Sequence, residues 1–114
     1  MGDVKAKPRK QKSRLAIERD IVLKAFELMC TAKCQAAAYD ANRDICSRYV
    51  HSTSRGHEAI QVATGLQLQP CDFLSPYYRD DAMLLALGLE PYELMLQLMA
   101  KRDDPIAGLY AGDA

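Results

Sequence analysis

The amino-acid sequence predicts an all-α fold, with one long helix followed by about three shorter helices. Apolar residues recur at steps of three and four positions over several stretches, which is the spacing of one face of a helix. Pro and Gly mostly stand between these stretches. No stretch shows the strict alternation of apolar and polar residues that is typical of a strand.

The longest helix is predicted from about Ser13 to Asp40, a stretch without Pro or Gly. Its apolar face follows helical steps and consists of Ile21, Ala25, Leu28, Ala32, Ala36 and Tyr39. Val22, Phe26 and Met29 widen this face beyond a narrow seam. A face of this width indicates packing against more than one neighbour, so we expect the helix to be central.

A loop and a shorter helix are predicted next. Polar residues break the helical pattern from Asn42 to Gly56, and the Gly can adopt backbone angles closed to other residues. The second helix has apolar positions at Ala59, Val62, Ala63 and Leu66. It should end by Pro70, whose nitrogen cannot donate a hydrogen bond.

Two further short helices are predicted after an extended stretch from residue 70 to residue 78. Pro76 biases the residue before it away from helix. Asp80 and Asp81 favour the start of the third helix through its dipole, and Gly88 ends it. The fourth helix begins near Pro91, and its last turn carries Lys101 and Arg102. Its amphipathic face consists of Leu94, Met95, Leu98, Met99 and Lys101, and it ends at Asp103, Asp104 and Pro105.

The chain has 114 residues, enough for one domain, and its charge is unevenly spread. We divide it into a basic flexible arm at 1–13, a helical segment at 14–105 and a flexible tail at 106–114. Residues 1–14 carry a formal charge of +5, and the rest carries −5. The arm has no aromatic side chain to stack on bases, so we expect a solvated leader and no nucleic-acid partner.

The sequence gives no sign of a membrane segment or of secretion. No apolar run approaches the roughly 20 residues that span a bilayer, and no apolar segment follows the basic start. The four cysteines, Cys30, Cys34, Cys46 and Cys71, do not form the dense framework of a small extracellular protein. We therefore expect reduced thiols in a cytoplasmic protein.

Several residues could carry chemistry, but their patterns are weak. Cys30 and Cys34 could bind a metal with His51 or His57, although buried free cysteines acting as small apolar residues are the favoured interpretation. Cys71 has no base placed near it to make it a nucleophile. We predict no metal site and no catalytic residue in this chain.

His57 and Glu58 stand at the start of the second predicted helix. A His beside a carboxylate is an arrangement used in acid–base catalysis. Adjacent helical residues point about 100° apart, however, and a Glu at a helix start is favoured by the helix dipole. We favour this second interpretation, with His57 as a polar neighbour.

Tyr77, Tyr78 and Arg79 lie where the extended stretch meets the third helix. A phenol next to a guanidinium at a helix start can offer charge-assisted hydrogen bonds to a phosphate group. An Arg at such a position also commonly pairs with a nearby Asp. Position alone leaves both interpretations open.

The order of several short motifs resembles a known family. The motifs are Ser54-Arg55-Gly56-His57-Glu58-Ala59, Gly65, Asp72-Phe73-Leu74, Tyr78-Arg79-Asp80, Leu87-Gly88 and Glu93-Leu94. Together they resemble the N-terminal region of the alpha-type part of thiamine-diphosphate-dependent 2-oxo acid dehydrogenases. These enzymes are the decarboxylating first component of the pyruvate and branched-chain 2-oxo acid dehydrogenase complexes. The resemblance runs from about Ile21 to Pro105, and Ser52 to Glu58 is similar to the branched-chain type or to fused alpha-beta forms.

The resemblance implies a fold, an activity and a cofactor. The helices would be the N-terminal helical part of a larger α/β thiamine-diphosphate-binding fold. The enzyme would decarboxylate a 2-oxo acid oxidatively and pass the acyl group to lipoyl, using thiamine diphosphate with magnesium. Tyr78 and Arg79 would bind the cofactor's diphosphate. The helix opened by Gly56 and Glu58 would be mainly structural, and His57 stands where the family often has a polar amide or an acid.

The departures from the family pattern concern the rest of the catalytic site. The family binds magnesium through Gly-Asp-Gly followed later by an Asn, and Gly112-Asp113 does not match this pattern. The catalytic carboxylate belongs to the beta-type part. We therefore expect an N-terminal portion that is inactive alone and works with the remainder of the dehydrogenase or as a homo-oligomer. The alternative is a non-catalytic helical interaction or regulatory module derived from the family, and which 2-oxo acid is used stays open.

Overall fold

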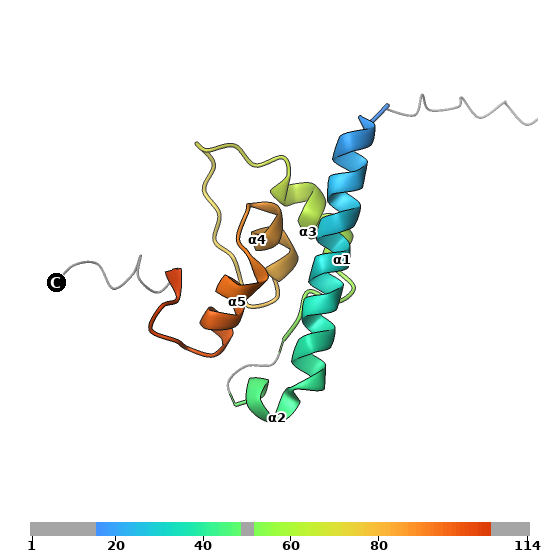
Figure 1. Cartoon of the computed structure of the whole chain (residues 1–114). Coiled ribbons are helices and arrows are strands. Elements are labelled where there is room, and N and C mark those ends of the chain that lie inside the picture. The colour runs from blue at the N-terminus through green and yellow to red at the C-terminus, as the bar shows by residue number, and fades with distance from the viewer. Residues whose placement is uncertain (1–15, 49–51, 106–114) are drawn as a thin grey trace, which may run out of the picture.

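The computed structural model describes residues 16–48 and 52–105, and all regular structure in these ranges is helical (Figure 1). The helices are α1 (Arg19–Ala41), α2 (Arg43–Cys46), α3 (Glu58–Gly65), α4 (Asp81–Ala86) and α5 (Pro91–Leu98). The predicted all-α class, with one long helix and several shorter ones, is confirmed. The predicted basic arm at 1–13, the predicted tail at 106–114 and His51 lie outside the described residues.

The predicted loop from Asn42 to Gly56 was wrong at its start, because α2 follows α1 almost directly. The backbone N–H of Asn42 donates to the carbonyl oxygens of Ala38 and Tyr39, each at 3.2 Å, and its side-chain amide also donates to Ala38. The chain then makes one new turn, in which the N–H of Cys46 donates to the carbonyl of Asn42 at 2.9 Å. A single turn shows no apolar periodicity, so the sequence could not reveal it.

Two predicted helices end earlier than expected. α3 ends at Gly65 and not at Pro70, since Gln67 N–H donates to Thr64 in a tighter turn. α5 ends at Leu98, before Lys101. Ala100 adopts a positive φ of 48°, and Lys101 N–H donates to the carbonyl of Leu96 at 2.9 Å. This closes the helix in the way that a glycine commonly does, but no glycine marks the position.

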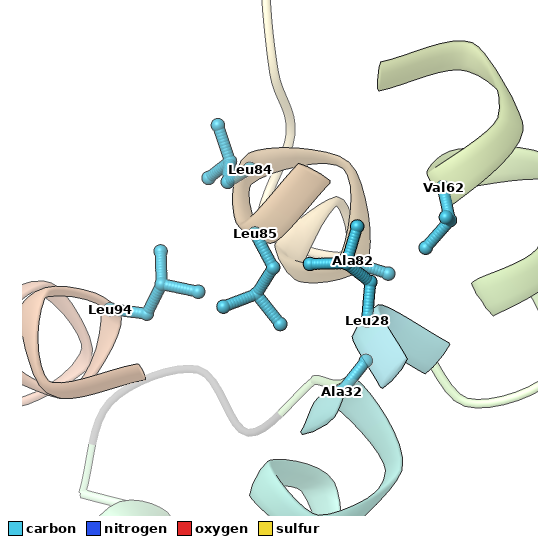
Figure 2. Close-up of a cluster of buried hydrophobic side chains, with 7 residues drawn as sticks. All are labelled: Leu28, Ala32, Val62, Ala82, Leu84, Leu85 and Leu94. Atoms are coloured by element: carbon cyan, nitrogen blue, oxygen red, sulfur yellow. The ribbon is translucent and has the colours of Figure 1, made fainter. Parts of the chain in front are cut away.

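The core is formed between four of the helices (Figure 2). It gathers buried side chains from α1, α3, α4 and α5, namely Leu28, Ala32, Val62, Ala82, Leu84, Leu85 and Leu94. Leu84 and Leu85 leave α4 in different directions, so α4 packs on more than one side (Figure 2). A Cβ atom added to Gly65 would lie 2.6 Å from the Cβ atom of Ala86, which shows how closely α3 approaches α4.

The apolar face predicted for the long helix is buried only in its second half. Leu28, Ala32, Ala36 and Tyr39 are buried, whereas Ile21 is 49% exposed. The N-terminal end of α1, blue in Figure 1, extends beyond the shorter helices. The described helices lack the combination of length and apolarity that spanning a membrane requires.

Candidate functional site

The segment Tyr77–Arg79 forms a turn immediately before α4. The carboxylate of Asp80 accepts a hydrogen bond from the backbone N–H of Tyr77 at 2.7 Å, and the N–H of Asp80 donates to the carbonyl of Tyr77 at 3.0 Å. An Asp that bonds to the backbone a few residues before it closes such a turn locally. The turn leaves Tyr78 45% exposed and Arg79 exposed as well.

Gln61 of α3 also holds this turn in place through side-chain hydrogen bonds. Its side-chain amide donates to the carbonyl of Arg79 at 2.9 Å and approaches the Oδ1 atom of Asp80 at 3.4 Å. Gln61 is 7% exposed, and its Oε1 atom has no hydrogen-bond partner among the described residues. This amide ties the position of the turn to the core helix α3. Gln61 was not predicted from the sequence, because nothing in its spacing links it to the turn.

The side chains of the turn interact with one another. The ring centroids of Tyr77 and Tyr78 are 3.9 Å apart, and the Cζ atom of Arg79 lies 5.7 Å from the centre of the Tyr78 ring. The hydrogen bond from Tyr77, assisted by one from Arg79, lowers the pKa of Tyr78, while the same phenol pair raises the pKa of Tyr77. A phenol and a guanidinium are both hydrogen-bond donors. Tyr78 and Arg79 therefore present two adjacent donors.

A cavity of about 320 Å³ lies on one side of this turn. Its walls come from α1, α4, α5 and the segments that precede α3 and α4. The lining residues are Tyr39, Ser52, Pro76, Tyr77, Tyr78, Asp81, Leu84, Leu94, Gln97 and Leu98. Burial, with a smaller contribution from the charge of Asp80, raises the pKa of Asp81 to about 6. Burial also raises the pKa of Tyr39. The cavity has both polar and apolar walls, and it holds one carboxyl group whose proton is lost near pH 6.

A second pocket, of about 290 Å³, lies on the Arg79 side of the turn. We call it the arginine pocket, and its lining residues are Asp40, Arg43, Ser52, Thr53, Arg55 and Arg79. Ser52 lines both the cavity and the arginine pocket. An Nη2 atom of Arg55 lies 2.7 Å from the Oδ2 atom of Asp40. Arg79 was predicted as a site residue from the sequence, whereas Arg43 and Arg55 were not, because the three residues are far apart in the chain and meet only in the fold.

The other candidates from the sequence are not brought together. His57 is exposed at the N-cap of α3, and the carboxylate of Glu58 accepts a hydrogen bond from the N–H of Gly56 at 2.8 Å. That contact supports the helix-start interpretation of Glu58. All four cysteines are free; Cys46 is buried, but Cys30, Cys34 and Cys71 are exposed, so the interpretation as buried apolar residues was wrong for Cys30 and Cys34. Within the described ranges, no group of three or more His, Cys, Asp or Glu residues is placed to hold a metal ion.

Comparison with known proteins relates this geometry to a family. The profile of the family described as Dehydrogenase E1 component matches residues 27–113. The chain is also similar to the 2-oxoisovalerate dehydrogenase subunit alpha of Bacillus subtilis (strain 168), with 40% identity over 55 residues. These residues are 47% of this chain and only 17% of that protein. No solved structure gives a significant match. The family match covers most of the chain and includes the turn, the cavity and the arginine pocket. The chain therefore belongs to the dehydrogenase E1 component family.

Proposed function

We propose that this chain supplies diphosphate-binding residues to a thiamine-diphosphate-dependent 2-oxo acid dehydrogenase. The single observation that carries the proposal is the turn before α4, which holds Tyr78 and Arg79 exposed and side by side. A guanidinium and a phenol are suited to phosphate oxygens, because both donate and one is always charged. This donor set fits the diphosphate of the cofactor.

The contribution of these residues is binding and orientation. When bound, the cofactor supplies the chemistry that decarboxylates the 2-oxo acid. Arg79 would offset the negative charge of the diphosphate, and Tyr78 would donate to one of its oxygens. Gln61 and Asp80 would keep both groups in place through the hydrogen bonds that fix the turn. Magnesium would be held by residues outside the set described here.

We further propose that the chain acts together with the remaining parts of a cytoplasmic dehydrogenase. The relative from Bacillus subtilis is named as an alpha subunit, which supports a partner of the beta type. The acyl group would pass to lipoyl after decarboxylation. On this proposal the chain has no dehydrogenase activity alone.

Titration calorimetry of thiamine diphosphate with magnesium tests the proposal. In the chain assembled with its beta-type partner, Arg79→Ala should weaken cofactor affinity by about tenfold to a hundredfold, because one charge-assisted hydrogen bond is lost. Arg102→Ala, which removes an exposed Arg after α5, serves as the matched control and should leave affinity unchanged. Unchanged affinity in Arg79→Ala would contradict the assignment.

A second candidate function is a non-catalytic interaction module. The observation that favours it is the exposed apolar surface on the first half of α1, which includes Ile21, Val22 and Phe26. Such a module would bind a complete dehydrogenase without binding the cofactor. The same calorimetry separates the two, because the module would give no heat at millimolar cofactor even in the presence of its partner.

A further inference from the structure

The arginine pocket collects positive charge from three separate parts of the chain. Arg43 begins α2, Arg55 precedes α3, and Arg79 belongs to the turn before α4. With Asp40 as the one carboxylate in the lining, the formal charge of the pocket is +2. The structure records no ion pair of Arg43 or Arg79 with another described side chain. Three guanidinium groups against one carboxylate leave an excess of positive charge, which a bound anion would offset.

Two of these groups are already held in position. Arg55 is paired with Asp40 at 2.7 Å, and Arg79 lies over the ring of Tyr78. Holding a long side chain before binding lowers the entropy that binding costs. Guanidinium groups that are partly held around one open hollow therefore favour an anion.

The remaining polar groups of the pocket also suit an anion. Ser52 and Thr53 contribute hydroxyl groups. The Oγ1 atom of Thr53 lies 3.4 Å from the backbone nitrogen of Arg55, which places it as an acceptor there. Its hydroxyl hydrogen can then still donate into the pocket. Asp40 is the exception, since its carboxylate would repel an anion.

We propose that Arg43 and Arg55 are anion ligands that complete, together with Arg79, a pocket for a diphosphate group. The inference rests on the proposed function in placing a diphosphate at Arg79, and adds two ligands from the α1–α3 connection. Planar guanidinium groups bind phosphate oxygens with paired hydrogen bonds, and three of them can share the oxygens of two linked phosphates. Asp40 holds Arg55 in place and at the same time weakens the site.

Calorimetric titration of the purified chain with inorganic diphosphate at low salt tests this proposal. Arg43→Gln and Arg55→Gln should each weaken binding by about tenfold to a hundredfold, the loss expected for one charge-assisted contact. Asp40→Asn should tighten binding by about threefold or more, because a repulsive charge is removed. Arg19→Gln, which removes an exposed charge at the start of α1, should change nothing. Circular dichroism confirms that each variant keeps its helices.

The outcomes separate this inference from the proposed function. Loss of affinity in Arg79→Gln alone, with Arg43→Gln and Arg55→Gln unaffected, would overturn the inference and leave the function standing. Loss in the Arg43 and Arg55 variants but not in Arg79→Gln would support an anion pocket and contradict the cofactor assignment. Absence of any binding of inorganic diphosphate at millimolar concentration would overturn the inference. Thiamine diphosphate and thiamine monophosphate, titrated in parallel, show whether the second phosphate carries the affinity.

Discussion

Asp81 is a partly buried carboxyl group at the start of α4 whose pKa is shifted. Burial raises its pKa from 3.8 to about 6. The folded state therefore binds a proton more tightly than the unfolded chain. The stabilisation from this proton is fully present below about pH 4 and is lost as the pH rises through about 6. The free energy of unfolding should thus contain a contribution of at most about 3 kcal/mol that disappears by about pH 7.5.

Asp81→Asn isolates this contribution. The variant should raise the free energy of unfolding near pH 7.5, by at most about 3 kcal/mol, because an amide carries no charge to desolvate. Loss of a negative charge at the start of α4 would subtract about 0.3–1 kcal/mol from that gain. Near pH 4 the gain should vanish. Urea unfolding at the two pH values measures the effect, with Asp103→Asn as an exposed control, and equal effects at both pH values would contradict the assigned cause.

Individual site residues could be predicted only where local sequence carries the signal. Tyr78 and Arg79 are adjacent at a helix start, and the structure keeps them exposed together, although their role as ligands stays a prediction. Arg43, Arg55 and Gln61 reach the same region from other elements. Their placement depends on how α1 and α3 pack, which no local pattern contains.

At the scale of elements, the contact between α3 and α4 depends on one missing side chain. A Cβ atom on Gly65 would lie 2.6 Å from the Cβ atom of Ala86 and 2.9 Å from the carbonyl oxygen of Met83. Neither is the flexible end of a side chain, so the two helices must separate to admit a methyl group. The same contact supports the position of α4, and therefore of the turn in front of it.

Gly65→Ala should destabilise the chain by about 1–3 kcal/mol, the usual cost of overpacking a tight contact. The thermal midpoint of unfolding measures the loss. The double variant Gly65→Ala, Ala86→Gly should recover part of it, since one of the two colliding atoms is removed. A single variant as stable as the natural chain would show that the helices are not packed as closely as described.

The elements themselves were predicted where their apolar spacing was long enough to be read. The helix over residues 13–40 was identified because its pattern repeats over many turns, and Gly88, with a φ of 105°, ends α4 as expected. The one-turn α2 was missed because its four residues contain no repeat. The early end of α5 was missed because Ala100 takes a backbone conformation that usually calls for Gly.

At the scale of the whole molecule, the first half of α1 remains largely uncovered. Ile21, Val22 and Leu23 are all about half exposed, and Phe26 is 66% exposed. Three consecutive helical residues point about 100° apart, so apolar side chains face solvent on several sides of the helix. Charged residues such as Asp20, Lys24 and Glu27 lie among them, and an exposed apolar surface of this kind is typical of an interaction site. The predicted self-association therefore has a definite surface in this structure.

Sedimentation of the purified chain should show a dimer or larger species held together through α1. Ile21→Ser combined with Phe26→Ser should raise the dissociation constant at least about tenfold, because each apolar side chain contributes roughly 1.5–3 kcal/mol when buried. Tyr92→Ser, which replaces a similarly exposed aromatic residue on α5, serves as the control and should leave the mass distribution unchanged. A natural chain that sediments only as a monomer would contradict the predicted self-association.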